Sequence, residues 1–143
     1  MKPVLAFALI AVLLALSALH LYWGFGGRWP GHDAASLREM VVGSRGQHMP
    51  GLGPSAGVAC ALAAAALVVV LKHWPVAPWQ GWIITAGYVV LIAVFGLRGL
   101  ATYVTPIFEY ARGTAFVDLN RQMYSPLCLA IALALVLDFP RAG

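Results

Sequence analysis

The sequence predicts an all-α integral membrane protein, an antiparallel four-helix bundle that forms one domain over its 143 residues. Two observations point to this class. Apolar residues make up 62% of the chain and charged residues only 10%, with a mean hydropathy of +0.84, whereas soluble domains contain roughly 45–50% apolar and 25% charged residues. The apolar residues also fall into four runs, each close to the about 20 residues that a helix needs to cross a membrane. The same composition excludes an intrinsically disordered chain and a disulfide-rich scaffold.

The first predicted span covers residues 3–23, a run of 21 residues without a charge. This run has some features of a signal peptide, because Lys2 precedes it and Ala15-Leu16-Ser17 is similar to a cleavage site. It continues to Trp23, however, which makes it longer than the apolar region of a signal peptide. We therefore expect a true membrane span.

The next two predicted spans cover residues 54–72 and 79–104. Each begins with a charge-free run, of 18 residues in the first case and 19 in the second. The later span continues past Arg98 as a helix. A short turn with two prolines, residues 72–78, separates the two spans.

The fourth predicted span covers residues 120–139, and its charge-free part has only 16 residues. That is about 24 Å of helix at 1.5 Å per residue. Ser125 and Pro126 form a good start for a helix, but a helix that starts there is too short to span. A longer helix must contain Pro126, so we expect a kink or break there and a side-chain or water partner for the freed Gln122 carbonyl.

Four spans place both termini and the turn at residues 72–78 on one side of the membrane, which we call side A. The long connections, residues 24–53 and 105–119, then both lie on the opposite side, side B. In the first of them, Asp33 is a good N-cap for a short helix whose apolar face includes Leu37. This helix is either a surface helix that rests on the bundle or a lid over a site.

The nine Lys and Arg residues are scattered singly, so no basic stripe indicates nucleic-acid binding. Six of them lie on side B and three on side A, and this count alone favours side B as cytoplasmic. Side A, however, concentrates its three in short segments, and Lys2 precedes the first span. We therefore expect both termini on the cytoplasmic side.

Polar side chains gather at the side-B ends of the spans, and we take these as candidate ligand-binding residues: His20, Tyr22, Arg98, Arg121, Tyr124 and Ser125. Arg98 is the most informative, because it lies about 28 Å along a helix that starts at Trp79. At that depth an arginine either extends its head group to the interface or points inward and binds an anion, a headgroup or a carbonyl oxygen. Helical spacing places these side chains at similar depth, so we expect one shared pocket at the membrane edge, covered by residues 24–53.

His20 is the candidate acid or base if the pocket is catalytic, although a histidine near an interface is commonly a hydrogen-bonded structural residue. We expect no metal site, because His32 and His48 share no ligand spacing with His20, and the residue types assign no cofactor. Cys60 and Cys128 lie near side B on different spans, either as neighbours or as small buried apolar residues.

Four segments resemble a known family. They are HLYW at residues 20–23, GGRW at residues 26–29, FGLRG at residues 95–99 and DLNRQMYSPLC at residues 118–128, the last being the most specific. Together they are similar to a bacterial four-span membrane family catalogued as domain-of-unknown-function family 3995, over nearly the whole chain. The resemblance implies four membrane helices without an established activity, and we expect the bacterial inner membrane as the location.

Two functions stay open. The first is a non-catalytic binding or assembly module in the lipid bilayer, whose pocket holds a lipid headgroup, a quinone or a partner, the partner being a second copy of the chain or another membrane protein. The second is an enzyme that acts on a lipid-like substrate, with His20 as acid or base and Arg98 and Arg121 as electrostatic stabilisers. Transport is not supported, because four short spans have no acidic residue in the membrane and no repeat.

Overall fold

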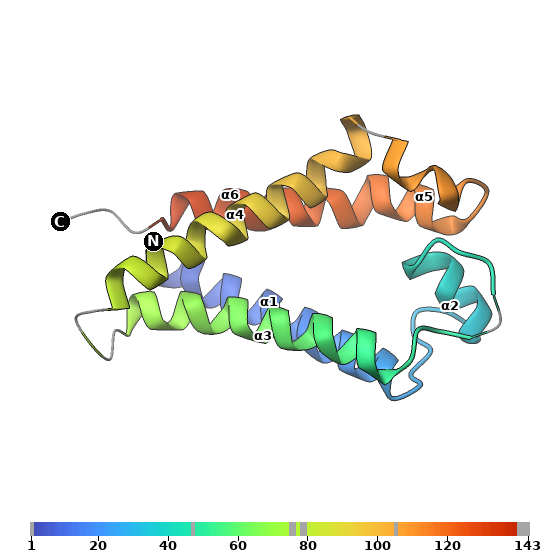
Figure 1. The fold of residues 1–143 in the computed structure, drawn as a ribbon, viewed down its shortest axis with the longest axis horizontal. Coiled ribbons are helices and arrows are strands. Elements are labelled where there is room, and N and C mark those ends of the chain that lie inside the picture. Colours follow the sequence, from blue (N-terminus) through green and yellow to red (C-terminus); the bar gives the residue numbers. More distant parts are fainter. Residues whose placement is uncertain (1, 47, 75–76, 78–79, 105, 140–143) are drawn as a thin grey trace.

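The protein is built from helices (Figure 1). The computed structural model describes residues 2–46, 48–74, 77, 80–104 and 106–139, and these residues form no strand. In chain order the elements are α1 (Lys2–Gly24), α2 (Ala34–Val41), α3 (Leu52–His73), α4 (Gly81–Val104), the 3₁₀ helix η2 (Pro106–Ala111), α5 (Ala115–Leu119), the π helix η3 (Asn120–Tyr124) and α6 (Ser125–Leu137).

Four helical segments are long and apolar enough to cross a membrane: Pro3–Gly24, Leu52–His73, Gly81–Val104 and Ala115–Leu137. Each has 22 to 24 residues, which is about 33–36 Å and exceeds the ~30 Å of hydrocarbon. The predicted all-α membrane architecture is therefore confirmed. The fourth segment begins at residue 115 and not at 120, because α5 and η3 continue into α6 as one helical run. Trp79, the expected start of the third span, lies outside the described residues, as do residues 75, 76 and 78 of the turn before it.

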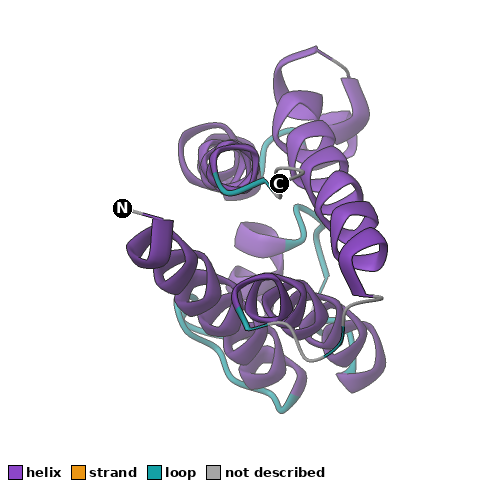
Figure 2. Cartoon of the chain, turned by 90° about the vertical axis from the view of Figure 1, so that its left-hand side faces the viewer, coloured by secondary structure: helices purple, strands orange, loops and turns teal. Residues whose placement is uncertain are grey.

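The four long helices form two antiparallel pairs. α1 packs along α3, α4 packs along α6, and the pairs contact each other through α3 with α4 and through α1 with α6. In Figure 1 the α1–α3 pair lies below the α4–α6 pair, and Figure 2 views the same two pairs from the left-hand end of Figure 1. The start of α1 and the end of α6 both lie at that end, which is side A, as expected for four antiparallel spans. α2 lies at the other end, side B.

The core lies where the two pairs meet near side A. Leu13 of α1, Val69 of α3, Tyr88 of α4 and Leu135 of α6 are each fully buried and belong to one apolar cluster. In lipid, apolar side chains gain little hydrophobic free energy by leaving the solvent, so the close packing of these side chains is what associates the helices.

A buried acid lies beside this core, directly after α6. The Asp138 carboxylate is 0% exposed, and it accepts bonds from Lys72 Nζ at 2.8 Å and from the Tyr88 hydroxyl at 2.6 Å. His73 Nε2 lies 3.1 Å from the same carboxylate, and Lys72 also donates to the Asp138 carbonyl. Because a buried charge must be paired, this one side chain connects α3, α4 and the end of α6.

The short helix α2 is capped as the sequence predicts. The Asp33 side chain accepts a bond from the Ser36 N–H at 2.7 Å, and the Ser36 hydroxyl accepts one from the Asp33 N–H at 3.0 Å, which is a reciprocal capping box. Leu37 is fully buried. The helix packs on α5. The hydroxyl of Tyr124, the last residue of η3, donates to the Met40 carbonyl of α2 at 3.2 Å. α2 therefore joins the first long connection to the second.

The expected interruption near Pro126 takes the form of the π helix η3. The Asn120 carbonyl accepts a bond from the N–H five residues ahead, and the proline that follows has no N–H to donate. The Arg121 carbonyl accepts a bond from the Tyr103 hydroxyl of α4 at 2.8 Å. In a π turn the backbone bond runs to the carbonyl five residues back, and not four, so the N–H that Pro126 lacks would have bonded to the Arg121 carbonyl. The carbonyl with a side-chain donor is therefore that of Arg121, where the sequence predicts Gln122.

Candidate functional site

Four hydrogen-bonded side chains connect α4 to the π turn at side B. Arg98 Nη2 donates to Asn120 Oδ1 at 2.8 Å, and Asn120 Nδ2 donates to the Thr102 hydroxyl at 2.8 Å. The Thr102 and Ser125 hydroxyl oxygens lie 2.5 Å apart. Asn120 and Ser125 are 1% and 0% exposed, so the Asn120 amide uses both its donor and its acceptor group inside the protein.

Backbone features bring these side chains together. Thr102 follows Arg98 by four residues, so both lie on the same face of α4. Gly99 allows α6 to come close, since a Cβ on this residue would lie 2.7 Å from a leucine side chain of α6 and 3.1 Å from the Ser125 carbonyl oxygen. The π turn places Asn120 opposite this face. Single π turns inside α-helices are frequent at functional sites.

The Arg98 guanidinium has no ion-pair partner in the described part of the chain. The acids that form ion pairs there are Asp138, at side A, and Glu109, which pairs with Arg112. The guanidinium lies 4.7 Å from the centroid of the Phe108 ring, a cation–π contact. Its Nη1 atom is buried without a hydrogen-bond partner among the described residues. Such a donor costs about 1–3 kcal/mol when it is left unsatisfied, so an acceptor at this position would be favourable.

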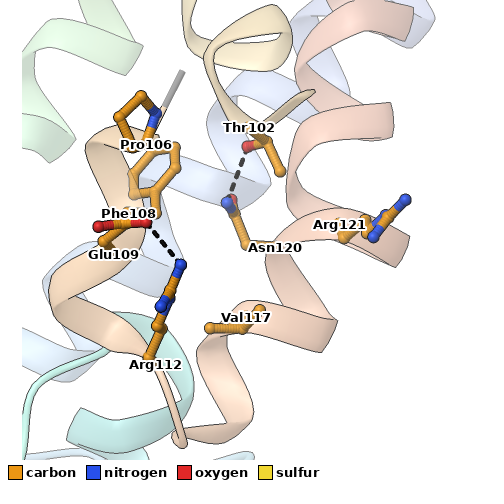
Figure 3. Close-up of a pocket in the computed structure, with 8 residues that line it drawn as sticks. All are labelled: Thr102, Pro106, Phe108, Glu109, Arg112, Val117, Asn120 and Arg121. Carbon is orange, nitrogen blue, oxygen red and sulfur yellow. Dashed lines mark hydrogen bonds and ion pairs between the residues drawn. The ribbon is translucent and has the colours of Figure 1, made fainter. Parts of the chain in front are cut away.

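A cavity of about 180 Å³ opens beside the network (Figure 3). Its lining comprises Thr102, Asn120 and Phe108, the arginines Arg112 and Arg121, and Pro106, Glu109 and Val117. Arg98 is not among the lining residues, but its guanidinium contacts two of them, Asn120 and Phe108. Figure 3 shows the head group of Arg121 turned away from the Glu109–Arg112 pair. Arg121 is exposed, and its side chain makes no hydrogen bond or ion pair with the described residues.

Three of the six predicted site residues belong to this region. Arg98 and Ser125 are members of the hydrogen-bonded network, and Arg121 lines the cavity. Tyr124 lies in the same π turn, and its hydroxyl bonds to the Met40 carbonyl of α2. Tyr124 thus connects this region to the first long connection, although no described residue of 24–53 lines the cavity.

The other two predicted residues make their contacts within their own segment. His20 Nδ1 lies 2.8 Å from the Leu16 carbonyl, and the imidazole packs edge-on against Trp23 at 5.1 Å. The Tyr22 hydroxyl accepts bonds from the N–H groups of the loop at residues 28 and 29. Among the described residues, no contact joins His20 or Tyr22 to Arg98. Their convergence with the arginines stays a prediction.

Sequence reasoning did not select Asn120, Thr102 and Phe108. A signal for Thr102 was present, because it lies one turn beyond Arg98 on the same helix. Asn120 stands inside the most specific of the four family-like segments, but only the π turn places it against α4. Phe108 belongs to η2, and the sequence of this segment has no periodic pattern that would predict its position after α4.

The remaining candidate groups are the two cysteines and the possible metal ligands. Cys60 of α3 is exposed and Cys128 of α6 is half-buried, and both thiols are free. Within the described part of the chain, no three His, Cys, Asp or Glu side chains come together as metal ligands.

The comparison with known families agrees with this architecture. Residues 13–135 match the family described as protein of unknown function (DUF3995). The chain belongs to the DUF3995 family. The resemblance inferred from the four segments is thereby confirmed. No curated protein and no solved structure matches the chain. The stretch shared with DUF3995 contains the whole Arg98–Asn120–Thr102–Ser125 network.

Proposed function

We propose that this DUF3995 protein is a non-catalytic binding module of the membrane that holds an anionic headgroup in the side-B cavity. The observation that carries the proposal is Arg98 Nη1, a buried donor on a charged group without a partner among the described residues. An anion beside Asn120 and Phe108 would give this donor an acceptor and compensate the guanidinium charge. A quinone carbonyl would satisfy the donor but leave the charge uncompensated, so we favour an anion.

Binding has better support than catalysis. The enzymatic alternative requires His20 within reach of a substrate held by Arg98, and the His20 contacts described above lie within α1. A binding role requires only the network and the cavity, with the lipid bilayer as the source of the ligand.

Lipid retention tests this proposal. The purified protein is placed in nanodiscs of phosphatidylcholine that contain some anionic phospholipid, and native mass spectrometry then measures which lipids stay bound. We expect the wild type to retain anionic lipid and Arg98→Gln to lose it. Arg28→Gln removes an exposed arginine of side B that does not line the cavity, and we expect it to retain the lipid. Equal retention by all three proteins would contradict the proposal.

A second variant separates binding from folding. In Asn120→Asp, a carboxylate replaces the amide oxygen that accepts the Arg98 bond, so the guanidinium gains a charged partner without losing the contact. We expect an unchanged or higher melting temperature together with less bound anionic lipid. Full lipid retention in this variant would mean that the headgroup is not bound through the charge of Arg98.

A further inference from the structure

Resting on the proposed function, we infer that the bound headgroup is a phosphomonoester carried by a lipid, a terminal phosphate without a further substituent. This names the ligand class of the side-B cavity. Charge and donor geometry support it, and depth supports a lipid as its carrier.

The charge at the cavity matches a dianion better than a monoanion. Arg112 and Arg121 line the cavity, and Arg98 contacts two of the lining residues, Asn120 and Phe108. The one acid of the lining, Glu109, is paired with Arg112 at 2.6 Å. Two guanidinium charges, those of Arg98 and Arg121, therefore have no negative partner among the described residues. A phosphodiester carries a single negative charge, whereas a phosphomonoester carries about 1.5–2 at neutral pH.

The donors also suit a terminal phosphate. Such a group offers three strong acceptor oxygens, one more than the two unsubstituted oxygens of a diester. Arg98 Nη1 is a donor in a fixed position, held by the bonds of the guanidinium to Asn120 and by its contact with Phe108. Arg121 is exposed, so its guanidinium is free to turn toward the cavity and bind two oxygens at once.

The size of the cavity is sufficient for a phosphate group. Its volume of about 180 Å³ exceeds the roughly 150 Å³ of an apolar protein cavity that holds benzene. This space admits a phosphate and its ester oxygen.

The depth of the cavity corresponds to the phosphate level of a bilayer. Thr102 lies 21 residues beyond Gly81, the start of α4, which is about 31 Å along the helix axis. The hydrocarbon core is ~30 Å thick, so a bilayer whose side-A boundary lies at Gly81 would have the cavity just outside its core. Val104 and Ile107, next to the cavity in the chain, are 71% and 61% exposed, and they offer apolar surface to an acyl chain. A lipid source is therefore favoured over free phosphate.

The test compares two lipids in one membrane. Nanodiscs of phosphatidylcholine contain equal small amounts of phosphatidic acid, a monoester, and phosphatidylglycerol, a diester. Native mass spectrometry measures the ratio of the two lipids that stay bound. We expect an enrichment of phosphatidic acid by about tenfold, as expected from one additional charge-assisted hydrogen bond. Arg121→Gln should reduce this enrichment toward unity, and the control Arg28→Gln should leave it unchanged.

The possible failures are distinguishable. If both anionic lipids are retained equally and Asn120→Asp releases both, the monoester inference is wrong and the proposed function stands. If neither anionic lipid is retained above phosphatidylcholine, both are wrong. Inorganic phosphate added in detergent tests the source, because displacement of phosphatidic acid at equal concentration would show that the lipid part contributes nothing and would overturn the lipid-borne ligand.

Discussion

The hydroxyl of Tyr88 donates a 2.6 Å hydrogen bond to Oδ2 of Asp138, a residue 50 positions further along the chain. Tyr88 is fully buried in the middle of the contact between the helix pairs, and Phe139 packs edge-on against its ring. Lys72 supplies the opposite charge at 2.8 Å. The contact between the two helix pairs at side A therefore depends on a polar cluster as well as on apolar packing.

The first prediction concerns this cluster. Tyr88→Phe keeps the ring and removes a donor to a buried carboxylate, so we expect a loss of about 1–3 kcal/mol in unfolding free energy. Thermal unfolding in detergent micelles measures it. Tyr110→Phe is the matched control, because its exposed hydroxyl donates to the Val42 carbonyl at the surface and its loss should cost less. Equal melting temperatures for Tyr88→Phe and the wild type would show that the cluster contributes nothing.

The second prediction concerns the π turn. Tyr103→Phe removes the donor to the Arg121 carbonyl, and we expect a cost of about 0.5–1.5 kcal/mol. Pro126→Ala restores a backbone N–H close to this carbonyl, so the Tyr103→Phe cost should be smaller in a Pro126→Ala background. A double-mutant cycle of unfolding free energies measures this coupling. Strictly additive effects would mean that the hydroxyl does not compensate for the wider turn.

The third prediction concerns the seat of α2 on α5. Gly43 has φ +75°, and a Cβ there would lie 2.7 Å from the Ala111 Cβ and 2.9 Å from Phe116. Gly43→Ala should therefore weaken the docking of α2 by about 1–3 kcal/mol. Hydrogen exchange of the α2 amides reports it. Gly53→Ala is the control, because its new Cβ meets nothing within 4 Å, and the exchange rates of the α2 amides should not change. Unchanged exchange rates in Gly43→Ala as well would contradict the described packing.

The fourth prediction concerns the cap of α2. The Ser36 N–H bond, and then the Ser36 hydroxyl, hold the pKa of Asp33 below its ordinary value of 3.8. A lowered pKa means that the cap stabilises α2 above pH 3.8 and that this contribution disappears as the pH falls through the lowered pKa. An NMR titration of the Asp33 carboxyl carbon should give a midpoint below 3.8. Asp33→Asn keeps a capping oxygen that does not titrate, so α2 should not fray on acidification in this variant. A titration midpoint above 3.8 for wild-type Asp33 would show that its carboxylate is not stabilised by the cap.

The fifth prediction concerns topology. Four antiparallel spans place residues 2 and 143 on the same side of the membrane. In a Cys60→Ala, Cys128→Ala background, single cysteines introduced as Lys2→Cys or Gly143→Cys should react with an impermeant maleimide from the same side. Labelling from opposite sides is incompatible with four spans. Labelling in inside-out membrane vesicles but not in intact cells would in addition establish the predicted cytoplasmic orientation of both termini.

The sequence was sufficient for features that depend on neighbours along the chain. The four apolar runs predicted the long helices, Asp33 predicted the cap of α2, and Pro126 predicted an interruption. Each of these follows from residues within a few turns of one another. The structure has helical segments at Pro3–Gly24, Leu52–His73 and Gly81–Val104, where spans 3–23, 54–72 and 79–104 are predicted, whereas α5, which is short and polar at Asp118, extends the fourth helical run to residue 115.

The sequence was insufficient for contacts made across the fold. Asp138 meets Lys72 and Tyr88, which lie 66 and 50 residues away, and nothing local marks those three residues as partners. Arg98 was selected as unusual, because an arginine is costly at that depth. Its partner Asn120 was not selected, since the register that brings the two together depends on one extra residue in the π turn.

The pairing of the helices has a consequence for biosynthesis. α1 has its main partner in α3, and α4 has its main partner in α6, so each half of the chain contains a complete helical hairpin. As the ribosome delivers the chain from its N-terminus, the first hairpin is finished while the second is still being made. Asp138 directly follows the second hairpin in the chain, and it bonds to Lys72 of the first hairpin. This connection between the two hairpins can therefore form only after α6 has been made.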